Sequence, residues 1–196
     1  MMTITRLYGD LTDLCLSIFD AGAPRQPVEI AERLMDCESV AMDCPEHHFI
    51  VPAALLTATR LAQGAPREAL EKDLSLAAQR ASKVAGGFCG SWGCCGAAVG
   101  CGIFAAVLTG SSPKKEADWA QVNQMTARCL ENVASVGGPR CCKRVTYLSI
   151  SEAIRQSPAL LGLALGEVPE ITCRRFMNSK ECRGVNCPYF PKKETR

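Results

Sequence analysis

Cysteine is the residue whose abundance first points to chemistry. Thirteen of the 196 residues are cysteine, several times its ordinary share. Thiols at this density indicate disulfides in an oxidising compartment, or metal binding and redox chemistry in a reducing one. The odd count and the adjacent pairs Cys94-Cys95 and Cys141-Cys142 fit a disulfide framework poorly, because neighbouring cysteines close only a strained ring. We therefore expect thiols that bind a metal or carry redox chemistry.

The spacing of the cysteines narrows the kind of metal site. The sequence contains no C-x2-C, the pair with which zinc fingers usually hold their ion and with which the bacterial ferredoxin run begins. Its spacings are longer, as in Cys89-x4-Cys94, Cys173-x8-Cys182 and Cys182-x4-Cys187. Such spacings suit ligands gathered from separate helix ends, as iron-sulfur clusters, which are wider than one ion, commonly require.

Four cysteines fall where the sequence predicts the beginning of a helix. Cys89 and Cys95 lie in or beside a glycine-rich loop, residues 86–93, and Cys141 and Cys142 follow the break Gly-Gly-Pro. At a helix N-terminus, unpaired N–H groups and the positive end of the dipole favour thiolate over thiol. We predict that these four cysteines bind a cofactor, an iron-sulfur cluster of the [4Fe-4S] type, with zinc as the alternative.

A second set of thiols is predicted to bind metal. Cys173, Cys182 and Cys187 lie in a polar C-terminal segment, where apolar packing does not explain their presence. We group Cys44 with them as metal ligands. Cys15, Cys101 and Cys129 stand among apolar residues and are expected to pack as small hydrophobic groups. Cys37 is left undecided between the two classes.

His47 and His48 are the only two histidines, and they follow Cys44 closely in the segment Asp43–His48. A histidine here could be a metal ligand or a general acid or base with a near-neutral pKa. It could equally cap a helix or fill a buried hydrogen-bonding position. We take both as candidate catalytic or ligand residues. No Ser-His-Asp pattern, Walker loop or dinucleotide fingerprint can be assembled around them.

The elements that must position these residues are predicted to be helical. Apolar residues recur at helical spacing, and no convincing alternating strands appear. We expect an all-α bundle of six to eight helices over residues 1–165, followed by an irregular, basic, cysteine-bearing tail, residues 166–196, held onto the same domain by metal. The expected helices are residues 4–19, 27–35, 47–61, 66–85, 94–108, 116–136 and 140–154.

One segment could be mistaken for a membrane span. Residues 84–113 carry no formal charge, but eight of the 30 are glycine and four are cysteine. We predict a buried helix there, in which Gly96 and Gly100 let another backbone approach closely, and no membrane span. Arg6 and Asp10 interrupt the N-terminal segment where a secretory signal needs apolar residues, which predicts a cytoplasmic protein.

The charge balance limits the possible partners. A net charge of +2 excludes whole-molecule electrostatic capture of DNA or of an acidic membrane. Residues 173–196 hold seven basic side chains against two acidic ones. If metal fixes that segment, the charges could receive an acidic redox partner, a small anionic substrate or RNA phosphate; otherwise they form a solvated basic end.

Several blocks of the sequence resemble a known family. These blocks are CPEHHFIVPAALL, GGFCGSWGCCGAAVGCGIFAAVLTG, GGPRCCKR and CRRFMNSKECRGVNCPYF. From about residue 40 to 190 they resemble an uncharacterised cysteine-rich domain family of anaerobic prokaryotes and archaea, sometimes joined to a methyltransferase-like domain. The glycine-rich block is also similar to the small helical redox proteins named for a C-GCAxxG-C-C pattern, from which GCCGAAVG departs by an inserted Cys-Gly.

The resemblance implies a thiol or metal site in an anaerobic cytoplasm. It points to His47, His48, Cys89, Cys95, Cys141, Cys142, Cys173, Cys182 and Cys187. Three functions remain open: an iron-sulfur protein of anaerobic redox, sulfur or small-molecule chemistry; a metal-free dithiol redox protein; and a docking module stabilised by zinc.

Overall fold

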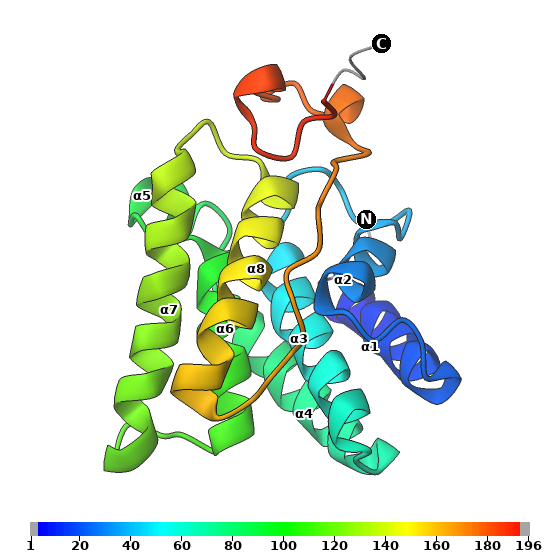
Figure 1. Cartoon of the computed structure of the whole chain (residues 1–196), viewed down its shortest axis with the longest axis vertical. Coiled ribbons are helices and arrows are strands. Elements are labelled where there is room, and N and C mark those ends of the chain that lie inside the picture. The colour runs from blue at the N-terminus through cyan, green and yellow to red at the C-terminus, as the bar shows by residue number, and fades with distance from the viewer. Residues whose placement is uncertain (1–3, 193–196) are drawn as a thin grey trace.

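The regular structure of the chain is helical, as predicted. A computed structural model describes residues 4–192, and within them there are eight α-helices, two short 3-10 helices and no strand (Figure 1). The α-helices are α1 (Ile4–Ala21), α2 (Pro27–Met35), α3 (His47–Gln63), α4 (Arg67–Ala81), α5 (Phe88–Ser91), α6 (Gly96–Thr109), α7 (Glu116–Val136) and α8 (Cys142–Leu161). The 3-10 helices, η1 (Phe176–Asn178) and η2 (Gly184–Asn186), lie in the tail.

Helix α6 lies in the middle of the bundle and packs against α3, α4, α7 and α8. Its glycines make room for these neighbours. A Cβ at Gly96 would lie 2.2 Å from the imidazole of His48, and one at Gly100 would lie 2.9 Å from Cδ of Pro52. Both contacts are with α3, so the close approach predicted at Gly96 and Gly100 is confirmed.

The helix boundaries differ most from the prediction in two places. The helix expected to reach residue 85 ends at Ala81, where the chain turns with Lys83 N–H donating to Arg80 O and Val84 N–H to Ala81 O. The helix expected over 140–154 begins at Cys142 and continues to Leu161 in spite of Pro158. A proline removes one backbone hydrogen-bond donor from a helix. The helix still continues past the proline where tertiary packing stabilises the turns that follow.

The apolar segment forms a helix too short for a membrane. Helix α6 has 14 residues, about 21 Å at 1.5 Å per residue, against a hydrocarbon core of about 30 Å. Within residues 4–192, no helix is long and apolar enough to cross a membrane.

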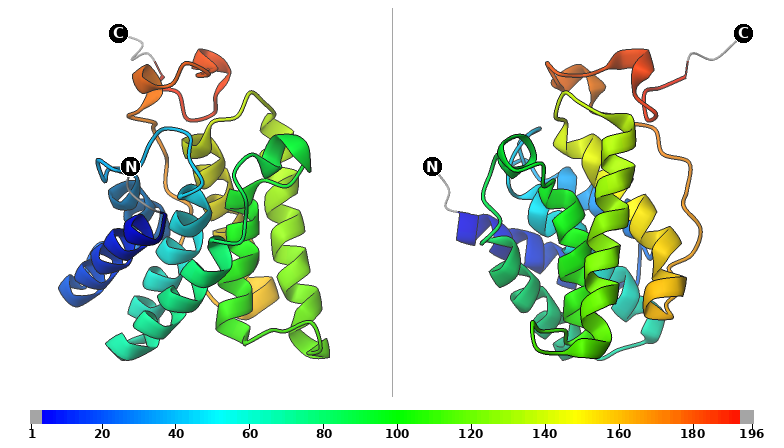
Figure 2. Two further views of the ribbon diagram at one scale, coloured as in Figure 1. Left: turned by 180° about the vertical axis from the view of Figure 1, so that it is seen from behind. Right: turned by 90° about the vertical axis from the view of Figure 1, so that its left-hand side faces the viewer.

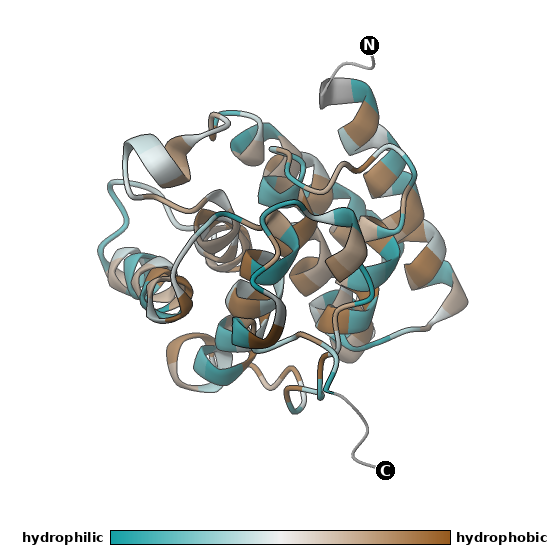
Figure 3. Ribbon diagram, turned by 90° about the horizontal axis from the view of Figure 1, so that it is seen from above, coloured by the Kyte–Doolittle hydropathy of each residue, from teal (hydrophilic) through white to brown (hydrophobic). Residues whose placement is uncertain are grey.

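One end of the bundle collects the segments that carry the predicted chemistry. The beginning of α8, the loop before α3, and α5 lie at this end, and the tail runs back along α8 from its far end to cover it (Figure 2). Figure 3 views the molecule from this side, with hydrophilic and apolar segments alternating along the helices as amphipathic packing requires.

Candidate functional site

The eight cysteines predicted to bind a cofactor or metal line two pockets, four in each. Cys44, Cys89, Cys95 and Cys142 line the larger one, here called the large cavity, and Cys141, Cys173, Cys182 and Cys187 line the smaller one, the tail pocket. The sequence analysis placed Cys141 in the first set and Cys44 in the second, and the structure exchanges them. Arg144 lines both pockets.

The start of α8 explains this exchange. Cys141 is the extended residue before the helix and Cys142 is the first helical residue, so their side chains diverge. The N–H of Cys142 donates to Oδ1 of Asp43 at 2.9 Å. This bond holds the loop before α3 against the start of α8, and it brings Cys44 to the cavity that Cys142 lines.

The tail pocket is formed where the tail folds over the start of α8. The N–H of Cys173 donates to the carbonyl of Tyr189 at 2.7 Å, which closes the tail into a loop. The N–H of Arg175 donates to Sγ of Cys173, and that of Gly184 to Sγ of Cys182, both at 3.4 Å. Burial raises the pKa of the Cys173 thiol, and the bond from Arg175 lowers it by less, so the net pKa lies above its ordinary value.

Three arginines, Arg144, Arg175 and Arg183, surround the four thiols of the tail pocket. Arg144 is buried and donates to the carbonyls of Gly137 and Pro139, while Arg183 donates to that of Val136. Within residues 4–192, neither Arg144 nor Arg183 has a carboxylate partner. The pocket therefore holds positive charge that an anionic occupant would balance.

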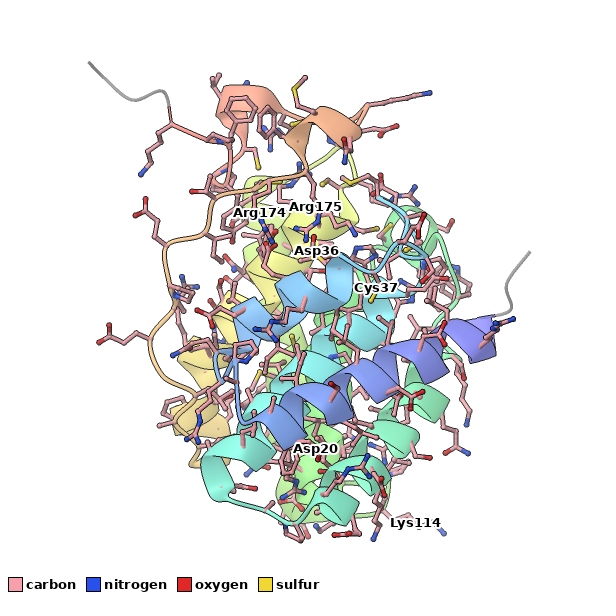
Figure 4. All side chains as sticks on the ribbon, turned by 90° about the vertical axis from the view of Figure 1, so that its right-hand side faces the viewer. Asp20, Asp36, Cys37, Lys114, Arg174 and Arg175 are labelled. Carbon is pink, nitrogen blue, oxygen red and sulfur yellow. The ribbon has the colours of Figure 1, made fainter. Side chains whose placement is uncertain are left out.

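Arg175 is held in a separate network with helix α2. Its guanidinium bonds the carboxylates of Glu32, at 2.9 Å, and of Asp36, and it donates to the hydroxyl of Tyr147 at 3.0 Å. Arg174 pairs with the same two carboxylates, and Figure 4 shows both arginines beside Asp36. These hydrogen bonds and the nearby Arg175 hold the pKa of Glu32 below its usual value, against the effect of its burial.

The fixed basic patch predicted for the tail is thus smaller than its composition indicates. Arg174 and Arg175 are paired with α2, and Lys192 pairs with Glu170 at 3.3 Å. Lys193 and Arg196 of the predicted patch lie outside the described residues. Pairing across 140 residues of chain neutralises charges that look free in the sequence.

The large cavity has a volume of about 690 Å³. It lies between the loop before α3, the glycine-rich loop with α5, and the beginnings of α6 and α8, and the C-terminal half of α7 closes one side. Both predicted histidines, His47 and His48, line it. The structure therefore brings the histidines together with Cys44, Cys89, Cys95 and Cys142, and leaves the tail cysteines apart.

His47 is 1% exposed, and its ring is polarised by the loop before it. Nδ1 lies 3.1 Å from the carbonyl oxygen of Cys44 and 3.3 Å from its Sγ. Because a carbonyl only accepts, we assign the proton of the neutral ring to Nδ1, and Nε2 is then a buried acceptor without a partner among the described residues. Burial lowers the pKa of His47 to about 3, so the expected near-neutral pKa is wrong.

His48 links the glycine-rich region to α3. Its Nδ1 lies 3.0 Å from the carbonyl oxygen of Val84, and its ring packs against the backbone of Gly96. Burial lowers the pKa of His48 below its ordinary value. Like His47, this histidine donates from Nδ1 to a backbone carbonyl, the arrangement that fixes the tautomer and leaves Nε2 free to accept.

Burial changes the pKa values of the thiols in both pockets more strongly than the nearby helix N-termini do. It raises the pKa of Cys44 to about 12, and it raises the pKa of Cys95 although the N–H groups of Ala98 and Ala97 lower it. Burial likewise raises the pKa values of Cys141 and Cys142. The sequence analysis expected thiolates at these helix N-termini, and desolvation outweighs that effect in the free protein.

The cysteines expected to pack do so. Cys15, Cys101 and Cys129 are fully buried, and the last two donate to the carbonyl of Ser149 at 3.4 and 3.6 Å. Cys37, which was undecided, is half-buried just after the end of α2 and lines neither pocket.

Sequence reasoning missed two parts of the site. Asp43 holds α8 to the loop before α3, and its position next to Cys44 was the available signal. The network of Glu32, Tyr147 and Arg175 joins segments more than 100 residues apart and has no local signal. Within residues 4–192, no three His, Cys, Asp or Glu side chains are close enough to hold a single metal ion as they stand.

Comparison with known proteins identifies a family. No curated protein and no solved structure matches the chain. One family does match, over residues 14–190, which include every residue of both pockets. The chain therefore belongs to the family of unknown function DUF5714.

Proposed function

We propose that this chain is an iron-sulfur protein of anaerobic redox, sulfur or small-molecule chemistry, with Cys141, Cys173, Cys182 and Cys187 as the cluster ligands. One observation carries the proposal. These four thiols come from the start of one helix and from a tail without α-helix, and they line one small pocket.

The surroundings of these thiols support a metal centre. Four thiolates bound to iron or zinc give the centre a net negative charge, which the guanidinium group of Arg183 would partly balance. A coordinating metal removes the thiol proton, so raised pKa values do not prevent binding. A metal-free dithiol needs a lowered pKa to act as a nucleophile. The raised pKa values of Cys141 and Cys142 therefore weigh against that alternative.

The arrangement of the sulfurs favours a cluster over one ion. Zinc requires its four sulfurs about 2.3 Å from a single point. The tail thiols come from widely spaced positions, 141, 173, 182 and 187, and a [4Fe-4S] cluster accepts each thiolate on a different iron. The volume of the tail pocket supports the other candidate. At about 20 Å³ it fits a single ion more closely than a cluster, which favours a docking module stabilised by zinc.

The proposal includes a setting and a partner. All thirteen cysteines are free thiols, which suits a reducing, anaerobic cytoplasm. The likeness of the glycine-rich block to the C-GCAxxG-C-C redox proteins supports the same setting. The exposed basic side chains of the tail that remain unpaired with α2, such as Lys180, would receive an acidic redox partner, in preference to RNA.

Anaerobic reconstitution tests the proposal directly. The protein is incubated with iron and sulfide, and the excess of both is then removed. We expect about four irons and four acid-labile sulfides to remain bound per chain, with a brown colour that is lost on exposure to air. Stoichiometric zinc without iron would support the docking module instead. A chain that retains neither metal would refute a metal centre altogether.

A further inference from the structure

The large cavity has the properties of a small-molecule site that the tail centre leaves unused. Its volume of about 690 Å³ lies within the range of ligand pockets. Much of the lining is glycine and apolar side chains, among them Phe88, Leu130, Val133 and Val145. A site of this kind orients its ligand through a few polar groups of the protein. Polar groups of the lining that lack a hydrogen-bond partner therefore indicate which chemical groups the ligand carries.

The first of these groups is the imidazole of His47. Nδ1 donates to the carbonyl of Cys44, so the buried Nε2 can only accept a hydrogen bond, and it has no partner among the described residues. The ring stays neutral at physiological pH. Leaving a buried acceptor unpaired is costly. A ligand bound here would remove that cost by presenting an O–H or N–H group.

The second feature is uncompensated positive charge. Helices α6 and α8 both begin at the cavity, with the positive ends of their dipoles turned to it. Arg144 is 3% exposed, its guanidinium bonds only backbone carbonyls, and its Nε–H is unpartnered within residues 4–192. This side of the cavity therefore lacks a negatively charged hydrogen-bond acceptor for the guanidinium of Arg144.

The acidic residues of the lining do not supply that charge. Asp43 accepts the N–H of Cys142, and its Oδ1 lies 3.7 Å from Nε of Arg140. Glu131 pairs with Arg128 at 3.5 Å. Both carboxylates therefore have partners of their own, and Arg144 is left without one.

We propose that the large cavity binds a small organic anion that also carries a hydroxyl or amino group. The donor meets Nε2 of His47, and the anionic group meets Arg144 near the start of α8. Arg144 also lines the tail pocket, so the two sites adjoin, but this site requires no metal, and its occupant is a diffusible small molecule.

Three matched compounds test the proposal on the full chain with its metal centre, under anaerobic conditions. Lactate carries the charge and the donor, propionate carries the charge alone, and 1,2-propanediol carries donors alone. Ligand-detected NMR titration gives a dissociation constant for each. We expect lactate to bind about tenfold more tightly than either of the others, which corresponds to about 1.4 kcal/mol. Equal binding of the three, or binding of none, would overturn the proposal.

Variants assign the two contacts. Asn at position 47 keeps a donor for the carbonyl of Cys44 but lacks Nε2, so His47→Asn should abolish the preference for lactate over propionate. Thr59→Val is the control, because it removes a buried side-chain bond to a backbone carbonyl, that of Leu55, in the same helix α3 but outside the cavity lining; it should keep the preference. A preference that survives His47→Asn would refute the assigned contact.

The charge is tested in the same way. Arg144→Gln should remove the advantage of lactate over 1,2-propanediol, whereas Arg140→Gln, at a more exposed arginine that already lies beside Asp43, is the control and should keep it. An advantage that survives in Arg144→Gln would contradict the anionic part of the proposal. Iron and sulfide are measured on every sample, so a failed ligand site is distinguished from a failed cluster.

Discussion

Cys141 and Cys142 show how much depends on single residues in this molecule. They are neighbours in sequence, yet one lines the tail pocket and the other lines the large cavity. Cys142 begins the helix and is tied to Asp43 through its N–H, while Cys141 remains extended. Two thiols of one dipeptide thus have different neighbours, and they should respond differently to replacement.

We expect Cys141→Ser to lose the iron and sulfide that the reconstituted protein binds, and Cys142→Ser to retain them. A serine hydroxyl is a poor ligand for soft metals, and only Cys141 lies with the tail thiols. Metal and sulfide analysis of both variants, together with the buried control Cys129→Ser, measures this. Equal loss in the two cysteine-pair variants would contradict the division into two sites.

The sequence could select the cysteines that line the two pockets but not their grouping. All eight selected thiols line a pocket, because loop positions and helix starts are visible in the pattern. Whether Cys44 belongs with Cys142 or with the tail depends on one hydrogen bond between residues 43 and 142, which are 99 positions apart. No local pattern records such a contact.

His47 gives a prediction about pH. Burial lowers its pKa from 6.5 to about 3, so the folded state binds the proton more weakly than the unfolded state does. Its neutral form therefore contributes stability that is complete above about pH 6.5 and is lost as the pH falls toward 3, by about 1.4 kcal/mol per pH unit. Between pH 7.5 and 5.5 the free energy of unfolding should fall by about 1.4 kcal/mol more in the natural protein than in His47→Asn. Denaturant titrations at both pH values measure this, and parallel pH profiles would show that His47 is not held neutral.

At the scale of elements, the glycines of α6 determine how closely the helices pack. Gly96 and Gly100 face α3, and Gly102 faces Thr126 of α7, where a Cβ would lie 2.0 Å from the hydroxyl oxygen. The sequence predicted close packing at Gly96 and Gly100 from small residues spaced along one helix. It could not identify the partner helix, because many neighbours satisfy the same spacing.

We expect Gly96→Ala to destabilise the protein by about 1–3 kcal/mol, the usual cost of overpacking. The new methyl group would collide with the ring of His48, and the bond from His48 to Val84 would weaken with it. Gly90→Ala is the matched control, since nothing lies within 4 Å of the added carbon, and a change within about 0.5 kcal/mol is expected there. Denaturant unfolding of both variants decides, and equal stabilities would mean that α3 moves aside without cost.

At the scale of the whole molecule, the tail is held to the bundle in two ways. Arg174 and Arg175 join it to Glu32 of α2 and to Asp36 just after that helix, and the metal centre that we propose for the tail pocket would join it to the start of α8. The sequence predicted a cysteine-bearing tail clipped by metal, but not the ion pairs, because the acidic residues of α2 look like an ordinary solvated helix face. The ion pairs lie near the start of the loop that Cys173 and Tyr189 close, and Cys182 and Cys187 lie beyond them. Variants can therefore remove one attachment of the tail and leave the other intact.

Cys182→Ser should loosen the tail beyond residue 176 without unfolding the helices. Removing one ligand weakens the metal centre that we propose to close this loop, whereas Arg175 keeps its bonds to Glu32 and Tyr147 and holds the segment before it. Hydrogen exchange on the metal-loaded protein should therefore show protection lost at residues such as Asn186 and Cys187 and retained in α3, α6 and α8. Cys37→Ser, outside both pockets, serves as the control and should leave the tail protected. Unchanged protection of the tail in Cys182→Ser would mean that the thiols do not hold it, and loss of protection throughout the chain would mean that the tail is part of the core and not a separately fastened segment.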